Sequence, residues 1–159
     1  MSHSTLSITS MTTPAEADAF RALNEEWISG LFTIEASDRK TLDDPFATIV
    51  DRGGDVLIVR DGEEIVGCVS LVPGPDGAYE LSKMAVTPAA RGRGIGRLLI
   101  QTTIERAREL GAATVFLGSS TKLPNAVHLY EAAGFQHVPA ERIPLAPYAR
   151  ADVFMELVL

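Results

Sequence analysis

Cysteine and long apolar runs are both scarce in this chain of 159 residues. The one cysteine, Cys68, cannot form an internal disulfide, so stability must come from a packed core, and a reducing compartment is expected. No apolar run approaches the roughly 20 residues of a membrane-spanning helix. The first residues, MSHSTLSITS, lack the charged and apolar regions of a signal peptide. We therefore expect a cytoplasmic protein that does not use a membrane as partner.

Positive charge is also scarce, since 14 lysines and arginines stand against 21 aspartates and glutamates, for a net charge of −7. An acidic chain is poorly suited to nucleic acid, because that binding depends on the neutralisation of phosphates. One basic cluster, Arg91, Arg93 and Arg97, alternates with glycines. It indicates a small anionic ligand, although a solvated basic turn has the same composition. The three histidines show no metal-ligand spacing, so no metal is expected.

Strand and helix patterns alternate along the chain. A capping box, Thr13 to Glu16 with Pro14 at the first helical position, predicts a helix start. Two further helices are expected over 94–110 and 125–133, and a short one within 34–49. The order predicts an α+β fold, a mixed, mostly antiparallel central sheet with helices on both faces. Strands are expected over residues 5–10, 55–60, 64–72, 78–86, 113–117, 135–138 and 152–159.

The stretch YELSKMAVTPAARGRGIGR, residues 79–97, is a strand followed by a glycine-rich loop that opens a helix. Glycines remove side chains where a backbone must approach a ligand. The first amides of the helix lack intrahelical partners, and the helix dipole adds positive potential at the same end. Together these features predict a pyrophosphate cradle formed by Arg91, Gly92, Arg93, Gly94, Ile95, Gly96 and Arg97.

Two other phosphate-binding loops do not fit this stretch. A Walker loop ends in Gly-Lys-Ser/Thr, which is absent here. A dinucleotide fingerprint would need glycine at position 97 or 99, where the chain has Arg97 and Leu99. That fingerprint also follows a first parallel strand, whereas this loop follows a predicted antiparallel meander.

Two segments share their order and spacing with a known family. Arg91-x-x-Gly94-x-Gly96 follows a strand, and about twenty residues further on comes NAVHLYEAAGF, residues 125–135. Both resemble the cofactor motifs of the GNAT-type N-acetyltransferase superfamily. The resemblance is clear over about residues 55–138. It implies a GNAT acyltransferase fold, with residues 1–159 as a single domain and a cofactor core at about 55–138.

The resemblance implies acetyl-CoA as co-substrate, and a primary amine that attacks it directly within a ternary complex. The pyrophosphate would lie on the loop 91–97, and Asn125 would contact the pantetheine or the reaction centre. Tyr130 matches the family's general acid, which protonates the leaving thiolate or stabilises its charge, and it also borders the cofactor. The pantetheine arm would pair, like an added strand, with the backbone of Met84, Ala85 and Val86.

A base is needed as well, because a free alkyl amine is almost entirely protonated at neutral pH. Glu80 starts the motif strand, where several members of the superfamily carry a catalytic glutamate. Two alternatives stay open, since Glu80 could bind the amine cation or be a strand-edge charge. Cys68, mid-strand, is interpreted as a core residue rather than a nucleophile.

The acceptor is expected to be a small molecule, and the acidic N-terminal half favours a cationic one. Asn24, Glu25 and Glu35 are candidate attractors, with solvated surface groups as the alternative. Trp27 and Phe32 could form the acceptor floor, with core packing as the alternative. Tyr148 and Arg150 could border the pocket, or Arg150 could form an ion pair. Other possibilities are a non-catalytic acyl-CoA-binding or sensing module, a different acyl donor, a hydroxyl acceptor and a protein amine acceptor. A homodimer is compatible with the resemblance.

Overall fold

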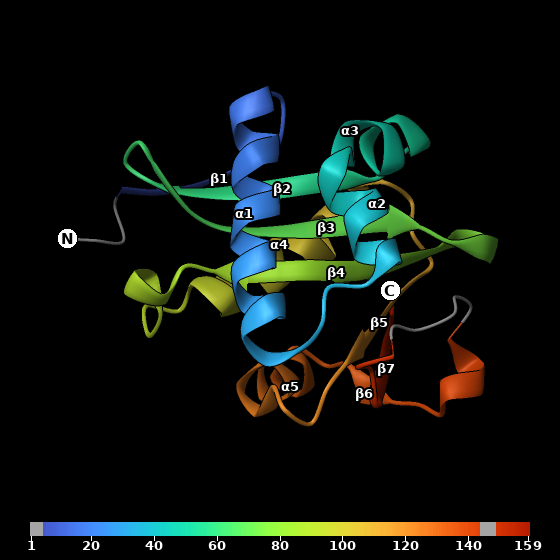
Figure 1. The fold of residues 1–159 in the computed structure, drawn as a ribbon. Helices are drawn as coiled ribbons and strands as arrows, with labels where there is room; N and C mark the ends of the chain where they lie inside the picture. The colour runs from blue at the N-terminus through green and yellow to red at the C-terminus, as the bar shows by residue number, and fades with distance from the viewer. Residues whose placement is uncertain (1–4, 144–148) are drawn as a thin grey trace.

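The computed structural model describes residues 5–143 and 149–159. Seven strands form one sheet in the order β1-β2-β3-β4-β5-β7-β6 (Figure 1). The first four strands pair antiparallel in chain order, as the predicted meander requires. The strands are β1 (Leu6–Ser10), β2 (Asp55–Asp61), β3 (Glu64–Pro73), β4 (Ala78–Val86), β5 (Thr114–Ser119), β6 (Gln136–His137) and β7 (Val153–Val158). The helices are α1 (Pro14–Leu31), α2 (Ala36–Asp43), α3 (Pro45–Thr48), α4 (Ile95–Glu109) and α5 (Pro124–Ala132).

The predicted α+β fold is confirmed, and the strand ends shift by no more than two residues. The capping box at α1 is formed: Glu16 N donates to Thr13 Oγ1, and the Glu16 carboxylate accepts from Thr13 N. One element differs from expectation, because α3 stands where a loop was predicted. Pro45 begins that short helix, and Asp44 caps it by accepting a hydrogen bond from Ala47 N.

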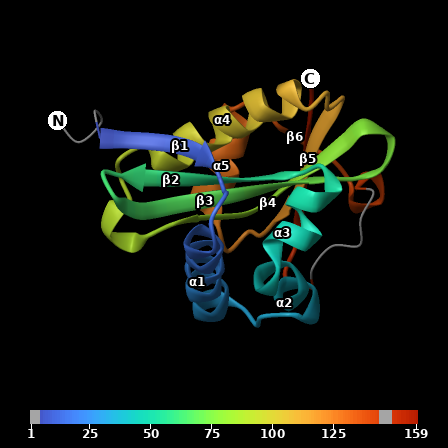
Figure 2. The same ribbon diagram turned by 90° about the horizontal axis from the view of Figure 1, so that it is seen from above.

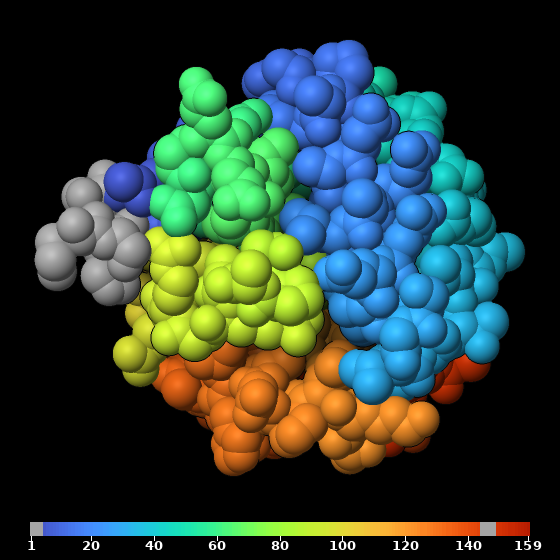
Figure 3. Space-filling view, turned by 60° about the vertical axis from the view of Figure 1, so that its left-hand side comes forward, coloured from blue at the N-terminus to red at the C-terminus, as the bar shows by residue number. Residues whose placement is uncertain are grey.

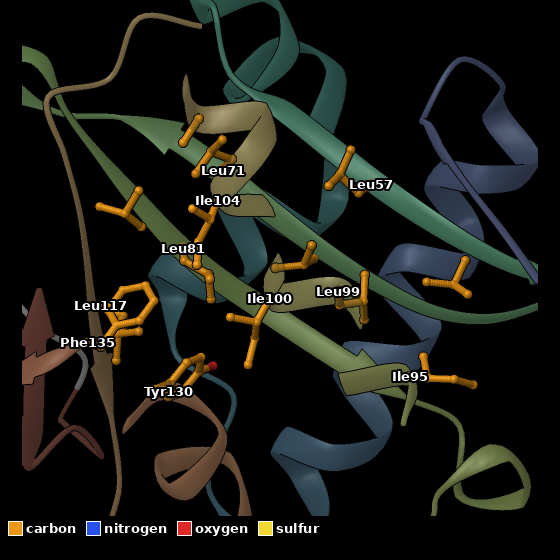
Figure 4. Close-up of a cluster of buried hydrophobic side chains, with 14 of the residues drawn as sticks. Leu57, Leu71, Leu81, Ile95, Leu99, Ile100, Ile104, Leu117, Tyr130 and Phe135 are labelled. Atoms are coloured by element: carbon orange, nitrogen blue, oxygen red, sulfur yellow. The ribbon is translucent and has the colours of Figure 1, made fainter. Parts of the chain in front are cut away.

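Helices cover both faces of the sheet, with α1, α2 and α3 on one side and α4 and α5 on the other (Figures 1 and 2). Under α1 lies a core that includes Phe20, Leu42 and Ile58. The core under α4 includes Leu99 and Ile100, and it continues to Tyr130 and Phe135 on the α5 side (Figure 4). No helix among the described residues is long and apolar enough to cross a bilayer.

β4 separates from β5 part-way along its length. The two strands run parallel and pair only between residues 78–80 and 114–116. Beyond that point β5 pairs with β7 on its other side, while β4 continues to pair with β3. A register shift between Cys68 and Ser70 marks a bulge near Lys83, whose φ is 56°. The result is a wedge between the second half of β4 and the end of β5.

Candidate active site

A pocket of about 550 Å³ occupies the wedge between β4 and β5. Its walls come from the end of α1, residues 81–86 of β4, the glycine-rich loop, residues 118–120 and the start of α5. In Figure 3, α1 (blue), the segment before α4 (yellow-green) and the segment that includes α5 (orange) meet on one face of the molecule. Segments that are far apart in the sequence therefore share one cavity.

The glycine-rich loop forms one wall of this pocket. Gly94 has φ of 78° and is the N-terminal cap of α4, a conformation that a side chain would strain. A Cβ at Gly96 would lie 3.0 Å from Leu129 Cδ1, so this position keeps α4 and α5 close together. Arg91 and Arg97 line the pocket. Arg93 does not, because its guanidinium lies 2.8 Å from the Asp61 carboxylate.

Among the other predicted cofactor residues, Gly92, Ile95, Asn125 and Tyr130 line the pocket, as do residues 84–86. The Tyr130 side chain is buried, and its ring packs edge-on against Phe135 with 5.7 Å between centroids. Burial raises the pKa of the Tyr130 phenol well above its ordinary value, so it stays protonated across the physiological range. The raised pKa makes this phenol a weaker acid than a free tyrosine, so it is suited to donating a hydrogen bond to a negatively charged atom.

Glu80 lies apart from this group. It pairs with Val72 of β3 and Phe116 of β5, in the closed part of the wedge, and it does not line the pocket. Burial raises the pKa of the Glu80 carboxyl, and the positive charge of Lys83 partly offsets this. Any contact between Glu80 and a pocket ligand would thus have to pass through another group or a water.

An ion-pair network joins two lining residues of the pocket, Lys83 and Arg150, to the carboxylate of Asp38. Arg150 donates to both carboxylate oxygens of Asp38, at 2.8 and 2.9 Å, and Lys83 Nζ lies 3.0 Å from Asp38 Oδ1. The side chains of Lys83 and Asp38 are 1% and 0% exposed. Burial alone would raise the pKa of Asp38, but hydrogen bonds from Arg150 and the Lys83 charge hold it at about 2.

Aromatic rings line the same side of the pocket. Trp27 and Phe32 meet edge-on, with 6.3 Å between their centroids. The Arg150 guanidinium lies 5.8 Å from the Trp27 ring centroid, and Lys122 Nζ lies 5.3 Å from that of Phe32. Trp27, Phe32 and Arg150 are candidates from the sequence, and all three line the pocket. Tyr148, the fourth candidate of this group, lies outside the described residues.

Sequence reasoning missed Lys83 and Lys122. A lysine inside the apolar strand SKMAV is a usable signal, because a buried lysine requires a partner. Lys122 gives no local signal, since it becomes a pocket residue only when the segment after β5 meets α1. Glu25, a predicted attractor of the acceptor, forms an ion pair with Arg39 at 2.6 Å and does not line the pocket.

Comparison with known proteins agrees with this geometry. The model of the acetyltransferase (GNAT) family matches residues 17–135, about three quarters of the chain. The chain belongs to the GNAT family. An uncharacterized N-acetyltransferase of Schizosaccharomyces pombe is 30% identical to it over 96% of the chain and 98% of that relative. N-acetyltransferases 8 and 8B of Rattus norvegicus are 34% and 37% identical over 54% of this chain, and the matched part is 41% of each of these longer relatives.

Solved GNAT structures share the fold. A GNAT acetyltransferase from Staphylococcus aureus superposes with a TM-score of 0.86 at 18% identity, covering 95% of this chain and 97% of its own. A GNAT acetyltransferase from Elizabethkingia anophelis, solved with acetyl-CoA bound, has a TM-score of 0.69 at 16% identity and covers 98% and 99% of the two chains. The GNAT fold and family are therefore shown, and with them an acetyl-CoA-dependent N-acyltransferase.

Proposed function

We propose that this GNAT enzyme binds acetyl-CoA in the wedge and transfers its acetyl group to the primary amine of a small molecule within a ternary complex. The observation that carries the proposal is the opening of β4 from β5 directly beside the glycine-rich loop. A backbone edge and an anion cradle within one cavity suit a ligand with an amide-containing arm and a pyrophosphate. Acetyl-CoA has both.

The residues of the wedge fit this ligand in three respects. Residues 84–86 of β4 line the pocket beyond the point where β5 stops pairing with β4. The amides at the start of α4, with Arg91 and Arg97 beside them, favour a pyrophosphate. Gly94 and Gly96 keep this end free of side chains. The Elizabethkingia anophelis relative, which holds acetyl-CoA on the same fold, supports this assignment.

When bound, the donor supplies a thioester whose carbonyl carbon the amine nitrogen attacks. The carbon–nitrogen bond forms, the carbon–sulfur bond breaks, and the amine gives up a proton. The sulfur leaves as a thiolate, and we assign to Tyr130 the hydrogen bond that stabilises its charge, because the phenol lines the pocket and stays protonated. The backbone amides of residues 84–86 would polarise the carbonyl, and Asn125 would orient the pantetheine or the reaction centre.

We propose that Glu80 accepts the proton of the amine through water. Its raised pKa makes it a stronger base than an ordinary carboxylate, and its position away from the pocket lining requires a relay. The alternative role, binding the amine cation, would need direct contact and is less compatible with this position.

Direct attack is favoured over an acyl-cysteine route. Cys68 is fully buried, burial raises the pKa of its thiol to about 12, and it does not line the pocket. We also propose that residues 1–159 act as one acetyltransferase domain with the cofactor core at about 55–138. From outside that core, α1 completes the pocket wall and α2 contributes Asp38 to the network beside it, which supports this organisation.

The test is an initial-rate assay of free CoA thiol released from acetyl-CoA in the presence of a panel of primary amines. The proposal predicts amine-dependent release and lines that intersect when both substrates are varied. Parallel lines would indicate an acyl-enzyme and refute the ternary complex. Acetyl-CoA binding with no release for any amine would instead support a sensing module.

A further inference from the structure

The charge of the pocket lining is opposite to that of the whole chain. The chain carries a net charge of −7, yet no described residue that lines the pocket is an aspartate or glutamate. Arg91 and Arg97 belong to the proposed pyrophosphate cradle. The remaining cations, Lys83, Lys122 and Arg150, come from three other segments, which are β4, the segment after β5 and the segment before β7. A cationic acceptor therefore meets no carboxylate there, whereas an anionic group does meet positive charge.

The carboxylates nearest to these cations lie behind or outside the pocket. Asp38 is 0% exposed and is held by Arg150 and Lys83 from the protein side. Glu35 lines only a second hollow, which shares Phe32, Lys122 and Arg150 with the pocket. Glu35 accepts a hydrogen bond from Ala149 N and lies 3.4 Å from Arg150. Two more carboxylates interact with these cations from outside the lining, Asp152 with Lys122 and Glu80 with Lys83. Carboxylates outside the lining therefore balance the three cations, and only the cations line the pocket itself.

The positive charge lies directly on an apolar wall. Lys122 and Arg150 converge on one ring, with Nζ at 5.3 Å and Cζ at 5.9 Å from the Phe32 centroid. Both cations line the wedge and the second hollow, so they lie where the two adjoin. Trp27 and Leu31 extend the apolar surface on the α1 side. A ligand that fits this wall has an apolar body and an anionic end.

We propose that the acceptor is an amino carboxylate with an apolar or aromatic body, and that Lys122 and Arg150 bind its carboxylate. This proposal rests on the proposed function, because it names the acceptor class of the same pocket. The amine points towards the thioester beside residues 84–86, the body lies against Trp27 and Phe32, and the carboxylate lies at the outer cations. Lys122 is the exposed member of the cation pair, so its replacement leaves the buried Asp38 network intact.

The experiment compares L-phenylalanine with L-phenylalaninamide and 2-phenylethylamine, which share the ring and the amine but lack the carboxylate. Binding of each compound to the CoA-saturated protein is measured by calorimetry, and kcat/KM is measured with acetyl-CoA. L-Leucine and L-leucinamide provide an aliphatic pair. The wild type is expected to favour at least one carboxylate over its amide by about tenfold or more, as a charge-assisted contact provides.

Lys122→Met is expected to remove most of this preference, and Lys122→Arg is expected to retain it. The matched control is Lys40→Met, which deletes an exposed lysine of α2 outside the pocket lining and should keep the wild-type ratio. Equal or better use of the amides by the wild type would overturn the proposal, as would binding of none of these compounds. An unchanged ratio in folded Lys122→Met would overturn the role of Lys122.

Failure of this inference can be told apart from failure of the proposed function. Acetyl-CoA binding with turnover of amines that lack a carboxylate overturns the acceptor class only. Failure of the folded wild type to bind any CoA species overturns the proposed function and, with it, this inference.

Discussion

The two sides of the pocket are built in different ways. The cofactor side, formed by residues 84–97 and the start of α5, relies on main-chain groups and on glycines at Gly94 and Gly96. The acceptor side relies on side chains from α1, α2, β4 and the segment before β7, joined by Asp38. The ligand proposed for the first side is acetyl-CoA, and a local sequence pattern is enough to build such a site. The second side depends on long-range contacts, so it can vary while the fold remains.

The largest expected effect comes from replacing Asp38, the carboxylate that Lys83 and Arg150 share on the acceptor side. Asp38→Asn leaves Lys83 and Arg150 without their shared negative charge in a buried site, and should lower the free energy of unfolding by about 3 kcal/mol. Urea denaturation measures this. The control is Asp43→Asn in the same helix. It removes an exposed carboxylate that lies 3.3 Å from Arg39 and should lower the free energy of unfolding by less than about 1 kcal/mol. Equal effects of the two substitutions would contradict the account.

A somewhat smaller effect is expected where the two sides meet. Tyr130→Phe removes the proposed hydrogen-bond donor to the leaving thiolate and should lower kcat by about 100-fold. Acetyl-CoA affinity should stay within about twofold of the wild type, because the substituted ring keeps its packing against Phe135. Initial rates and calorimetry measure the two quantities, so the substitution separates catalysis from cofactor binding. An unchanged kcat would remove Tyr130 from the mechanism.

The buried carboxylate of the acceptor side also predicts a pH dependence of stability. The pKa of Asp38 is about 2 in the folded protein, below its ordinary value of 3.8. Its contribution is therefore present above about pH 4 and is lost as the pH falls towards 2, by about 2 kcal/mol. Denaturation across this range should show the loss in the wild type and not in Asp38→Asn. Parallel curves for the two proteins would contradict the assignment.

The next effect is expected on the cofactor side alone. Gly94→Val places a β-branched residue at φ of 78° in the proposed cradle and should weaken acetyl-CoA binding by about tenfold or more. The matched control is Gly111→Val, which introduces the same kind of strain at φ of 82°, at the other end of α4 and away from the pocket. Calorimetry should show weaker binding for Gly94→Val only. Equal weakening in both variants would show that strain, not the cradle, is responsible.

The smallest effect is expected at Glu80, which lies outside the pocket lining. Burial raises its pKa in the folded protein, so its contribution to stability is present at low pH and is lost as the pH rises through that raised pKa. Glu80→Gln should therefore be more stable than the wild type at neutral pH. It should also flatten the acidic limb of the pH–rate profile. A profile identical to that of the wild type would exclude Glu80 as the base.

The same comparison explains how much could be predicted from the sequence. Periodicity and turn residues predict the strands and helices, because each depends on local patterns such as the capping box at Thr13. The cofactor loop is predictable for the same reason. The network of Lys83, Asp38 and Arg150 is not, because its members are separated by up to 112 residues and meet only in the fold. Arg93 shows that a local motif can also mislead. Its position predicts a place in the cradle, but the motif does not reveal its ion pair with the distant Asp61.

The most direct test of the two-sided pocket is calorimetric titration of the purified protein with acetyl-CoA, alongside free CoA and a longer acyl-CoA. The account predicts saturable binding at one site per chain, weakened in Gly94→Val and retained in Lys122→Met. Folded wild-type protein that binds none of these CoA species would contradict the account.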